Sequence, residues 1–208
     1  QRAESATFFG REIGLMYMHA HLRYAQALAH VGMAGDFFRA LCQASPIGIR
    51  SVVPTATLRQ ANCYYSSSDA AFADRYQARE QYARIHDGTI PLDGGWRVYS
   101  SGAGISLALT LRRFLGLTWE ARDLCIDPVM PGALDGMRVM TSLRGRPVEV
   151  TYRVGASGCG VNAIVLNGET LPFTCAANPH RRGAARVAAG SVLDRLGRSR
   201  NVLAIDLG

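Results

Sequence analysis

Two neighbouring histidines are the first residues of this sequence that could do chemistry. His19 and His21 lie in MYMHAHLRY, a segment whose apolar pattern is typical of a helix. Residues two apart on a helix point about 200° away from each other, so this pair cannot bind one metal ion. For each histidine, a hydrogen bond in the protein interior is the alternative to a contact with a ligand.

A run of small residues, Ser100 to Gly104, is the second such feature. It stands before an apolar stretch that we predict to be a helix ending at Gly116. A helix start without bulky side chains exposes backbone N–H groups and the positive end of the dipole, which together suit a phosphate. Glycines before a helix also serve as caps or allow close packing, so a mechanical role is the alternative. The hydroxyl groups of Ser100 and Ser101 can cap the helix or donate to a ligand.

The segment 59–76, RQANCYYSSSDAAFADRY, is rich in polar and aromatic side chains. Tyrosines beside amide groups suit sugar recognition, because the rings stack on the sugar face and the amides read its hydroxyl groups. An ordered loop whose Ser and Asp side chains satisfy its own backbone is the alternative. The carboxylates near these motifs show no spacing that marks a hydrolytic acid and base pair. They are Glu12, Asp69, Asp74 and Asp87.

Composition excludes several classes of protein. The net charge is +7 and all 23 basic residues are arginines, but they are scattered, which argues against a nucleic-acid surface. Apolar runs are too short for a transmembrane helix. The five cysteines include no C-x-x-C pair, so we expect neither a disulfide framework nor a zinc site, and a reducing cytoplasm is the expected location. The opening residues QRAE contain neither an initiator Met nor a signal peptide, which suggests a fragment of a longer protein.

The elements that must position these residues fall into two regions, one with helical and one with strand patterns. Helices are predicted over 14–32 and 35–46, followed by an irregular but ordered segment over 47–97 and the helix after Gly104. From Asp123 onward, short alternating segments with Gly, Pro and Asn turns predict strands, and Asn167-Gly168 predicts a hairpin. The predicted fold class is therefore α+β, with helices first and a small antiparallel β domain last.

Four segments in the same order resemble one enzyme family. They are REIGLMYMHAHLRYAQALA, NCYYSSSDAAFADRYQA, GGWRVYSSGAGI and LCIDPVMPGALDG. They look like the C-terminal part of the inverting phosphorylases of glycoside hydrolase family 94, which includes cellobiose phosphorylase. The polar loop and GGWRVYSSGAGI are most similar to the branch that acts on 1,2-β-glucooligosaccharides. The resemblance covers nearly the whole chain and is weakest over its last thirty residues.

The resemblance implies a fold and a reaction. Residues 1–118 would be the last helices of an (α/α)6 catalytic barrel, and residues 119–208 a C-terminal β-sandwich-like domain. The family splits β-glucosidic bonds with inorganic phosphate as co-substrate and yields α-glucose 1-phosphate with inversion, without a metal or another cofactor. Family members are often homodimers, which sets the same expectation here, and we expect no nucleic-acid or membrane partner.

The family's motifs also imply site residues. The pattern E-N-G-G-x-[FY]-x-H falls on Glu12 to His19, which makes His19 a phosphate ligand, although Ile13 and Leu15 replace the Asn and the second Gly. The family's T-G pair falls on Ser101-Gly102, which would also hold phosphate. The expected substrate contacts are Arg11, Glu12, Asn62, Tyr65, Asp69 and Arg75.

No residue of this chain inherits the family's general acid, which lies upstream of the His-bearing helix. We therefore assign no catalytic residue and give that role to neither Asp69 nor Asp74. Two alternatives within the family stay open: a cellobiose- or laminaribiose-type phosphorylase, and the phosphorylase-like module of a cyclic glucan synthase. A non-catalytic sugar- or phosphate-binding fragment is the alternative of another class.

Overall fold

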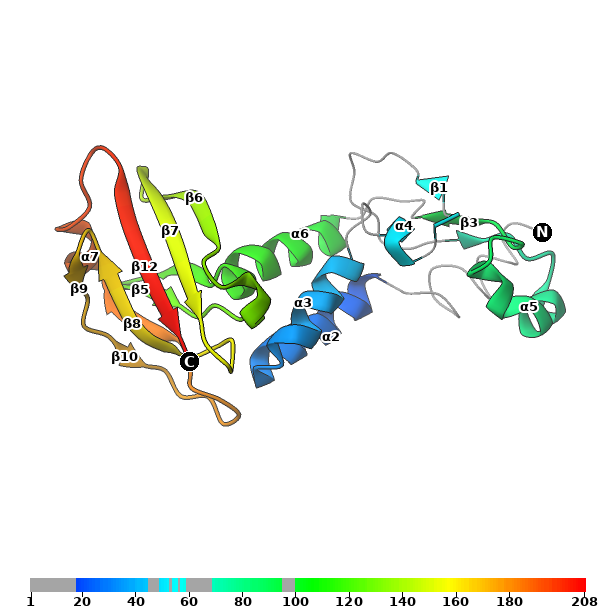
Figure 1. Cartoon of the computed structure of the whole chain (residues 1–208), viewed down its shortest axis with the longest axis horizontal. Coiled ribbons are helices and arrows are strands. Elements are labelled where there is room, and N and C mark those ends of the chain that lie inside the picture. Colours follow the sequence, from blue (N-terminus) through cyan, green and yellow to red (C-terminus); the bar gives the residue numbers. More distant parts are fainter. Residues whose placement is uncertain (1–17, 45–48, 53, 56, 59–68, 95–99) are drawn as a thin grey trace. The chain divides into compact units, whose positions relative to one another are not determined.

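The structure is a computed structural model that describes residues 18–44, 49–52, 54–55, 57–58, 69–94 and 100–208. Two compact units are distinguished, one comprising the described residues of 1–25 and 39–107, the other residues 26–38 and 108–208 (Figure 1). The divisions between the units fall inside three helices. These are α2 (Met18–Val31), α3 (Ala34–Gln43) and α6 (Ser100–Leu109).

The predicted helix over 14–32 ends where the sequence indicates. Gly32 adopts φ 86°, a left-handed conformation that glycine takes without strain. Gly32 N donates to Ala29 O at 3.3 Å and Met33 N donates to Leu28 O at 3.0 Å. This pair of hydrogen bonds is a Schellman motif, which satisfies two carbonyl groups at the end of α2. The helix α3 then follows as predicted.

The first unit holds short elements between the longer helices. The segment expected to be irregular over 47–97 contains a small sheet of order β1-β3-β2, in which β1 is parallel and β2 antiparallel to β3. Its elements are α4 (Ile49–Val52), β1 (Thr57–Leu58), β2 (Asp69–Ala70), α5 (Arg75–Gln81), the 3₁₀ turn η2 (Tyr82–Ile85) and β3 (Leu92–Gly94). The lack of a hydrophobic period in this segment therefore did not exclude a helix. α5 is short and buries one side chain, Ala78, so it leaves no such period in the sequence.

The helix after the small residues begins earlier than predicted. α6 starts at Ser100, so Ser101, Gly102 and Gly104 lie within the helix rather than before it. A glycine inside a helix costs only about 1 kcal/mol relative to alanine, so a short Gly-containing run does not prevent helix formation. α6 continues into a π-helical turn, η3 (Thr110–Phe114), and the left-handed Gly116 follows.

The second unit contains two sheets. One has the order β10-β11-β5-β4 and the other β6-β7-β12-β8-β9 (Figure 1). The strands of the first are β4 (Leu117–Glu120), β5 (Asp123–Ile126), β10 (Thr174–Cys175) and β11 (Ala185–Ala188). Those of the second are β6 (Arg138–Leu143), β7 (Arg146–Val154), β8 (Val161–Leu166), β9 (Glu169–Thr170) and β12 (Asn201–Leu207). Two short helices complete the unit, the 3₁₀ turn η4 (Gly132–Leu134) and α7 (Ala189–Leu193).

Both sheets contribute to one hydrophobic core. Leu124 and Ile126 of β5 are fully buried together with Val150 of β7 and Ile205 of β12. Alternation of buried and exposed residues along β12 places its apolar side chains on the core side. The predicted α+β class is confirmed, and the C-terminal β region has the packing of two sheets on a shared core.

The strand pairs in these two sheets are antiparallel except one. β12 lies between β7 and β8, parallel to β7 and antiparallel to β8. β12 arrives after the chain has passed through the other sheet, and such a long connection permits a parallel neighbour. The hairpin predicted at Asn167-Gly168 is confirmed, with φ 52° and 86° between β8 and β9.

Candidate functional site

The two histidines of α2 have different surroundings. His21 Nε2 lies 2.7 Å from the carbonyl oxygen of Ala40 in α3. Because a carbonyl oxygen only accepts, Nε2 must carry the proton, and His21 is an interhelical hydrogen-bond donor. The alternative of an interior hydrogen bond therefore holds for His21. His19 is half-buried in the first turn of α2, and its role as a phosphate ligand stays a prediction.

Ser101 and Gly102 lie in the first turn of α6, and Gly102 is buried. The first four N–H groups of an α-helix have no partner within the helix. The first turn of a helix, at its positive dipole end, is a place that suits an anion. That His19 and these residues bind one phosphate stays a prediction.

The expected substrate residues are described only in part. Arg11, Glu12, Asn62 and Tyr65 lie outside the described residues. The backbone of Asp69 belongs to β2 and pairs with Asp93 of β3.

Arg75, the last of the expected contacts, begins α5 and is exposed. Its Nη2 donates to the Tyr76 hydroxyl at 2.9 Å, and its guanidinium lies 4.9 Å from the centre of that ring. An exposed guanidinium on an aromatic ring is accessible to a ligand. Its role in substrate binding stays a prediction.

Asp74 has a structural role in the same segment. Its carboxylate accepts hydrogen bonds from the backbone N–H groups of Tyr76 and Gln77, both at 2.9 Å. Asp74 is thus the N-cap of α5, an arrangement that satisfies two N–H groups at the helix start. The described structure thus gives Asp74 a capping role, and the position of the general acid upstream of this chain stays a prediction.

Metal ligands do not gather in the described part of the chain. No group of three or more His, Cys, Asp or Glu side chains able to hold a metal ion occurs there. The described cysteines, Cys42, Cys125, Cys159 and Cys175, are free thiols. Among the described helices, none is both long enough and apolar enough to cross a membrane.

A buried ionic cluster in the second unit was missed by sequence reasoning. Arg181 forms a two-pronged pair with Asp127, Nη1 to Oδ1 at 2.6 Å and Nη2 to Oδ2 at 2.9 Å. Arg113 Nη1 donates to Asp127 Oδ2 at 2.6 Å. The side chains of Asp127 and Arg181 are only 9% and 6% exposed. No spacing signals this cluster, because Asp127 and Arg181 are 54 residues apart.

The charges of this cluster support one another. Burial lowers the pKa of the Arg181 guanidinium, but the hydrogen bonds and charge of Asp127 outweigh that effect and raise the pKa from its ordinary value. Arg181 therefore stays protonated in the interior. We name Asp127, Arg113 and Arg181 the Asp127 cluster.

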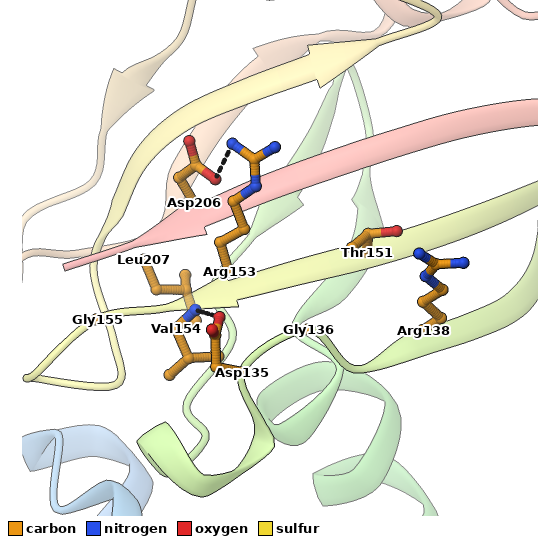
Figure 2. A pocket seen from close by; sticks show the side chains of 9 residues that line it. All are labelled: Asp135, Gly136, Arg138, Thr151, Arg153, Val154, Gly155, Asp206 and Leu207. Atoms are coloured by element: carbon orange, nitrogen blue, oxygen red, sulfur yellow. Dashed lines mark hydrogen bonds and ion pairs between the residues drawn. The ribbon is translucent and has the colours of Figure 1, made fainter.

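An open hollow lies on the five-stranded sheet, lined by residues of β6, β7 and β12 (Figure 2). Its charged groups are already used: Arg153 Nη1 lies 3.8 Å from Asp206 Oδ1, and Asp135 Oδ1 accepts from Val154 N at 2.8 Å. Arg138 and Arg153 are each 73% exposed. An open hollow whose arginines are mostly exposed lacks the enclosed, convergent polar groups of a ligand site.

The similarity to known proteins agrees with the resemblance found in the motifs. Residues 116–205 match the family of the glycoside phosphorylase C-terminal domain. The chain is 46% identical over 184 residues to a 1,2-beta-oligoglucan phosphorylase from Listeria innocua serovar 6a. That alignment covers 88% of this chain and 16% of the relative, so the chain spans about a sixth of the relative's length.

Proposed function

Because residues 116–205 belong to the family of the glycoside phosphorylase C-terminal domain, we propose that this chain is the C-terminal part of a phosphorylase of 1,2-β-glucooligosaccharides. The observation that carries the proposal is the 46% identity to a 1,2-beta-oligoglucan phosphorylase. The proposed reaction splits a β-glucosidic bond with inorganic phosphate. Its products are α-glucose 1-phosphate, formed with inversion, and a shortened oligosaccharide.

In this proposal the first turns of α2 and α6 hold the phosphate. The Ser101 hydroxyl and the N–H groups of Ser101 and Gly102 would donate to its oxygens, and His19 would donate from α2. Phosphate is anionic at neutral pH, so it needs positioning and charge stabilisation rather than a general base. The sugar contacts would come from Arg11, Glu12, Asn62, Tyr65, Asp69 and Arg75.

The proton for the departing oxygen must come from elsewhere in the enzyme. A carboxylic acid is needed for that step, and inversion places it on the opposite face of the sugar ring from the attacking phosphate. We place this acid upstream of the His-bearing helix, outside this chain, as the resemblance implies. The chain would supply the phosphate side of the active site.

The domain division and the barrel belong to the same proposal. Residues 1–118 would complete an (α/α)6 barrel, and 119–208 would form the C-terminal domain. Large apolar side chains on the helices are exposed in the described structure, including Tyr24 at 58% and Leu107 at 60%. Further helices of a barrel would cover such side chains. A cytoplasmic location, which suits the free thiols, and a homodimer are also proposed.

The experiment uses the full-length protein that carries this chain. It is incubated with 1,2-β-glucooligosaccharide, with and without inorganic phosphate, and glucose 1-phosphate is assayed. Phosphate-dependent product is the expected result. Product from cellobiose or laminaribiose alone would correct the linkage, cyclisation of the glucan would favour a synthase module, and no product from any of these sugars would overturn the proposal in favour of a non-catalytic fragment.

A further inference from the structure

The connection between β10 and β11 lies against the end of α2, within the second unit. We call residues 176–184 the β10–β11 arm. A hydrogen bond from Ala176 N to Ala184 O at 2.9 Å closes its base. β10 has two residues and lies at the edge of its sheet, paired with β11. A pairing this short holds the arm weakly, because a two-stranded ribbon is at best marginally stable by itself. Contacts outside the sheet must therefore fix the position of the arm.

Apolar burial contributes little to the arm. The hydrophobic core of the unit includes Phe173 before the arm and Ala185 after it, but no residue of the arm itself. Gly183 is the one residue of the arm that is buried as a whole. Segments with few buried apolar contacts open at a lower free energy than the core of a protein. We therefore expect the arm to open more easily than the sheets separate.

Polar side chains connect the arm to α2. Arg181 Nε donates to the carbonyl oxygens of Ala29 and His30, each at 3.2 Å, and Asn178 Nδ2 donates to His30 O at 3.2 Å. The rings of His30 and His180 meet edge to face, with centres 5.5 Å apart. Carbonyl groups in the last turn of a helix lack donors from within the helix, and a cation there also favours the negative end of the dipole. The arm thus caps α2.

Asp127 directs the arginine that makes most of these contacts. Arg181 Nη1 and Nη2 donate to the two carboxylate oxygens at 2.6 and 2.9 Å, and such a two-pronged pair forms in one relative orientation. The carboxylate is itself fixed, because Asp127 N donates to Gly116 O at 2.8 Å and the preceding residue, Ile126, is fully buried. A group that belongs to the β region therefore aims Arg181 Nε at the end of α2.

We propose that the β10–β11 arm is a latch on the end of α2, and that the buried carboxylate of Asp127 keeps this latch closed by orienting Arg181. Opening frees the carbonyl oxygens of Ala29 and His30 while the sheets of the unit stay paired. Loss of the Asp127 charge opens the latch, because an arginine without a partner in the interior is costly. The latch is independent of the proposed catalytic activity, and so is its test.

The first test is hydrogen exchange of the full-length protein at several low urea concentrations. We expect residues 26–33 and the arm to exchange through one common opening, since the same contacts close both. The free energy of this opening should hardly depend on urea, because a local opening exposes little surface. The amides of β7 and β12 should show a much larger urea dependence. Separate openings for residues 26–33 and the arm, or the urea dependence of β7 and β12 in both, would overturn the proposal.

The second test compares two residues next to the latch. Asp127→Asn keeps the size and removes the charge, and it should speed exchange of residues 26–33 and of the arm by at least about 100-fold, the low end of the cost of breaking a buried pair. Arg182→Met is the matched control on the same arm, because Arg182 Nη1 donates to Asn162 Oδ1 of β8 at 2.9 Å. Its exchange in residues 26–33 should equal that of the wild type. Acceleration no greater in Asp127→Asn than in Arg182→Met would overturn the proposal.

Two further variants keep the proposal testable if Asp127→Asn does not fold. Arg181→Lys keeps the charge but loses the two-pronged geometry, so it should open the latch nearly as far as Asp127→Asn. Asn178→Ala removes a single hydrogen bond to His30 O and should speed exchange of residues 26–33 roughly 3- to 10-fold. Wild-type exchange of residues 26–33 in both variants would show that the arm does not hold α2.

Discussion

Two carboxylates of the second unit are each shared by two arginines, yet their surroundings differ. Asp127 lies between Arg113 and Arg181, whose side chains are 35% and 6% exposed. Glu149 of β7 lies between Arg138 and Arg200, which are 73% and 71% exposed. The two carboxylates are similarly buried, at 9% and 13% exposed, but the arginines around Asp127 are much less exposed than those around Glu149. Burial, rather than the number of ion pairs, decides whether such a group controls structure.

The comparison also separates what the two groups connect. Asp127 joins the β region to the end of α2 and to η3, elements that lie far apart in the sequence. Glu149 joins neighbouring strands, β6 with β7 and the residue just before β12. Those strands are already paired by backbone hydrogen bonds, so the ion pairs add little. The end of α2 and η3 are not strands of these sheets, so they have no such backbone pairing with β5.

The largest effect is expected from Arg181→Met. The change leaves Asp127 with one arginine in the interior and removes the donor to Ala29 O and His30 O. Breaking a buried pair on one side costs about 3–5 kcal/mol. Hydrogen exchange of the β7 and β12 amides in the full-length protein should report this loss of opening free energy. A loss below about 1 kcal/mol, the level of an exposed pair, would contradict the claim that the ion pairs of Asp127 matter more than those of Glu149.

A smaller effect is expected from Gly32→Ala, which acts on the same cluster through the backbone. Gly32 has φ 86°, and an added Cβ would lie 2.9 Å from Arg181 Cδ and 3.1 Å from Cys159 Sγ. A left-handed backbone at a residue other than glycine costs about 1–3 kcal/mol. The thermal midpoint should fall. Gly168→Ala is the control for the backbone cost alone, because Gly168 is also left-handed and an added Cβ would have no atom within 4 Å. The thermal midpoint of this control should fall less.

Alkaline pH provides a third comparison, because arginines keep their proton while a thiol loses its proton and becomes a thiolate. Burial, followed by the hydrogen bond and charge of Glu120, raises the pKa of Cys125 from 9.0 to about 11. Between these values the folded state binds more protons than the unfolded state, so stability should decrease as pH rises through this window. Burial also raises the pKa of Tyr152 and acts in the same direction. Unfolding free energy measured from pH 8 to 10.5 should fall less steeply in Cys125→Ala, and an equal slope would contradict this assignment.

The smallest effect is expected from Arg200→Met. Arg200 pairs with Glu149 while largely exposed, and such pairs contribute about 0–1 kcal/mol. The same exchange measurement used for Arg181→Met should show almost no change. A loss as large as that of Arg181→Met would show that burial does not distinguish the two carboxylates.

Local signals account for the parts of the fold that the sequence could predict. Asn167-Gly168 and Gly32 adopt the left-handed conformations that their residue types favour, so the hairpin and the end of α2 were predictable. The start of α6 at Ser100 was not, since small residues are compatible with both a turn and a helix.

The Asp127 cluster could not be predicted at all. Its members come from η3, from the end of β5 and from the loop before β11, and only the packing of the two sheets brings them together. The site residues were predicted by resemblance to a family and not by any local pattern in this sequence. His21 shows the limit of residue type, because its hydrogen bond to Ala40 O follows from the packing of α2 and α3 and not from the residue itself.

The phosphate role of His19 is tested most directly against His21 on the same helix. In the full-length phosphorylase, initial rates are measured at varied phosphate and fixed oligosaccharide for His19→Ala and His21→Ala. We predict that His19→Ala raises the phosphate KM by at least about 10-fold, because a hydrogen bond to a charged group is lost, while His21→Ala lowers stability and leaves that KM unchanged. Equal phosphate constants in the two variants, or a larger effect at His21, would contradict the placement of phosphate at the first turn of α2.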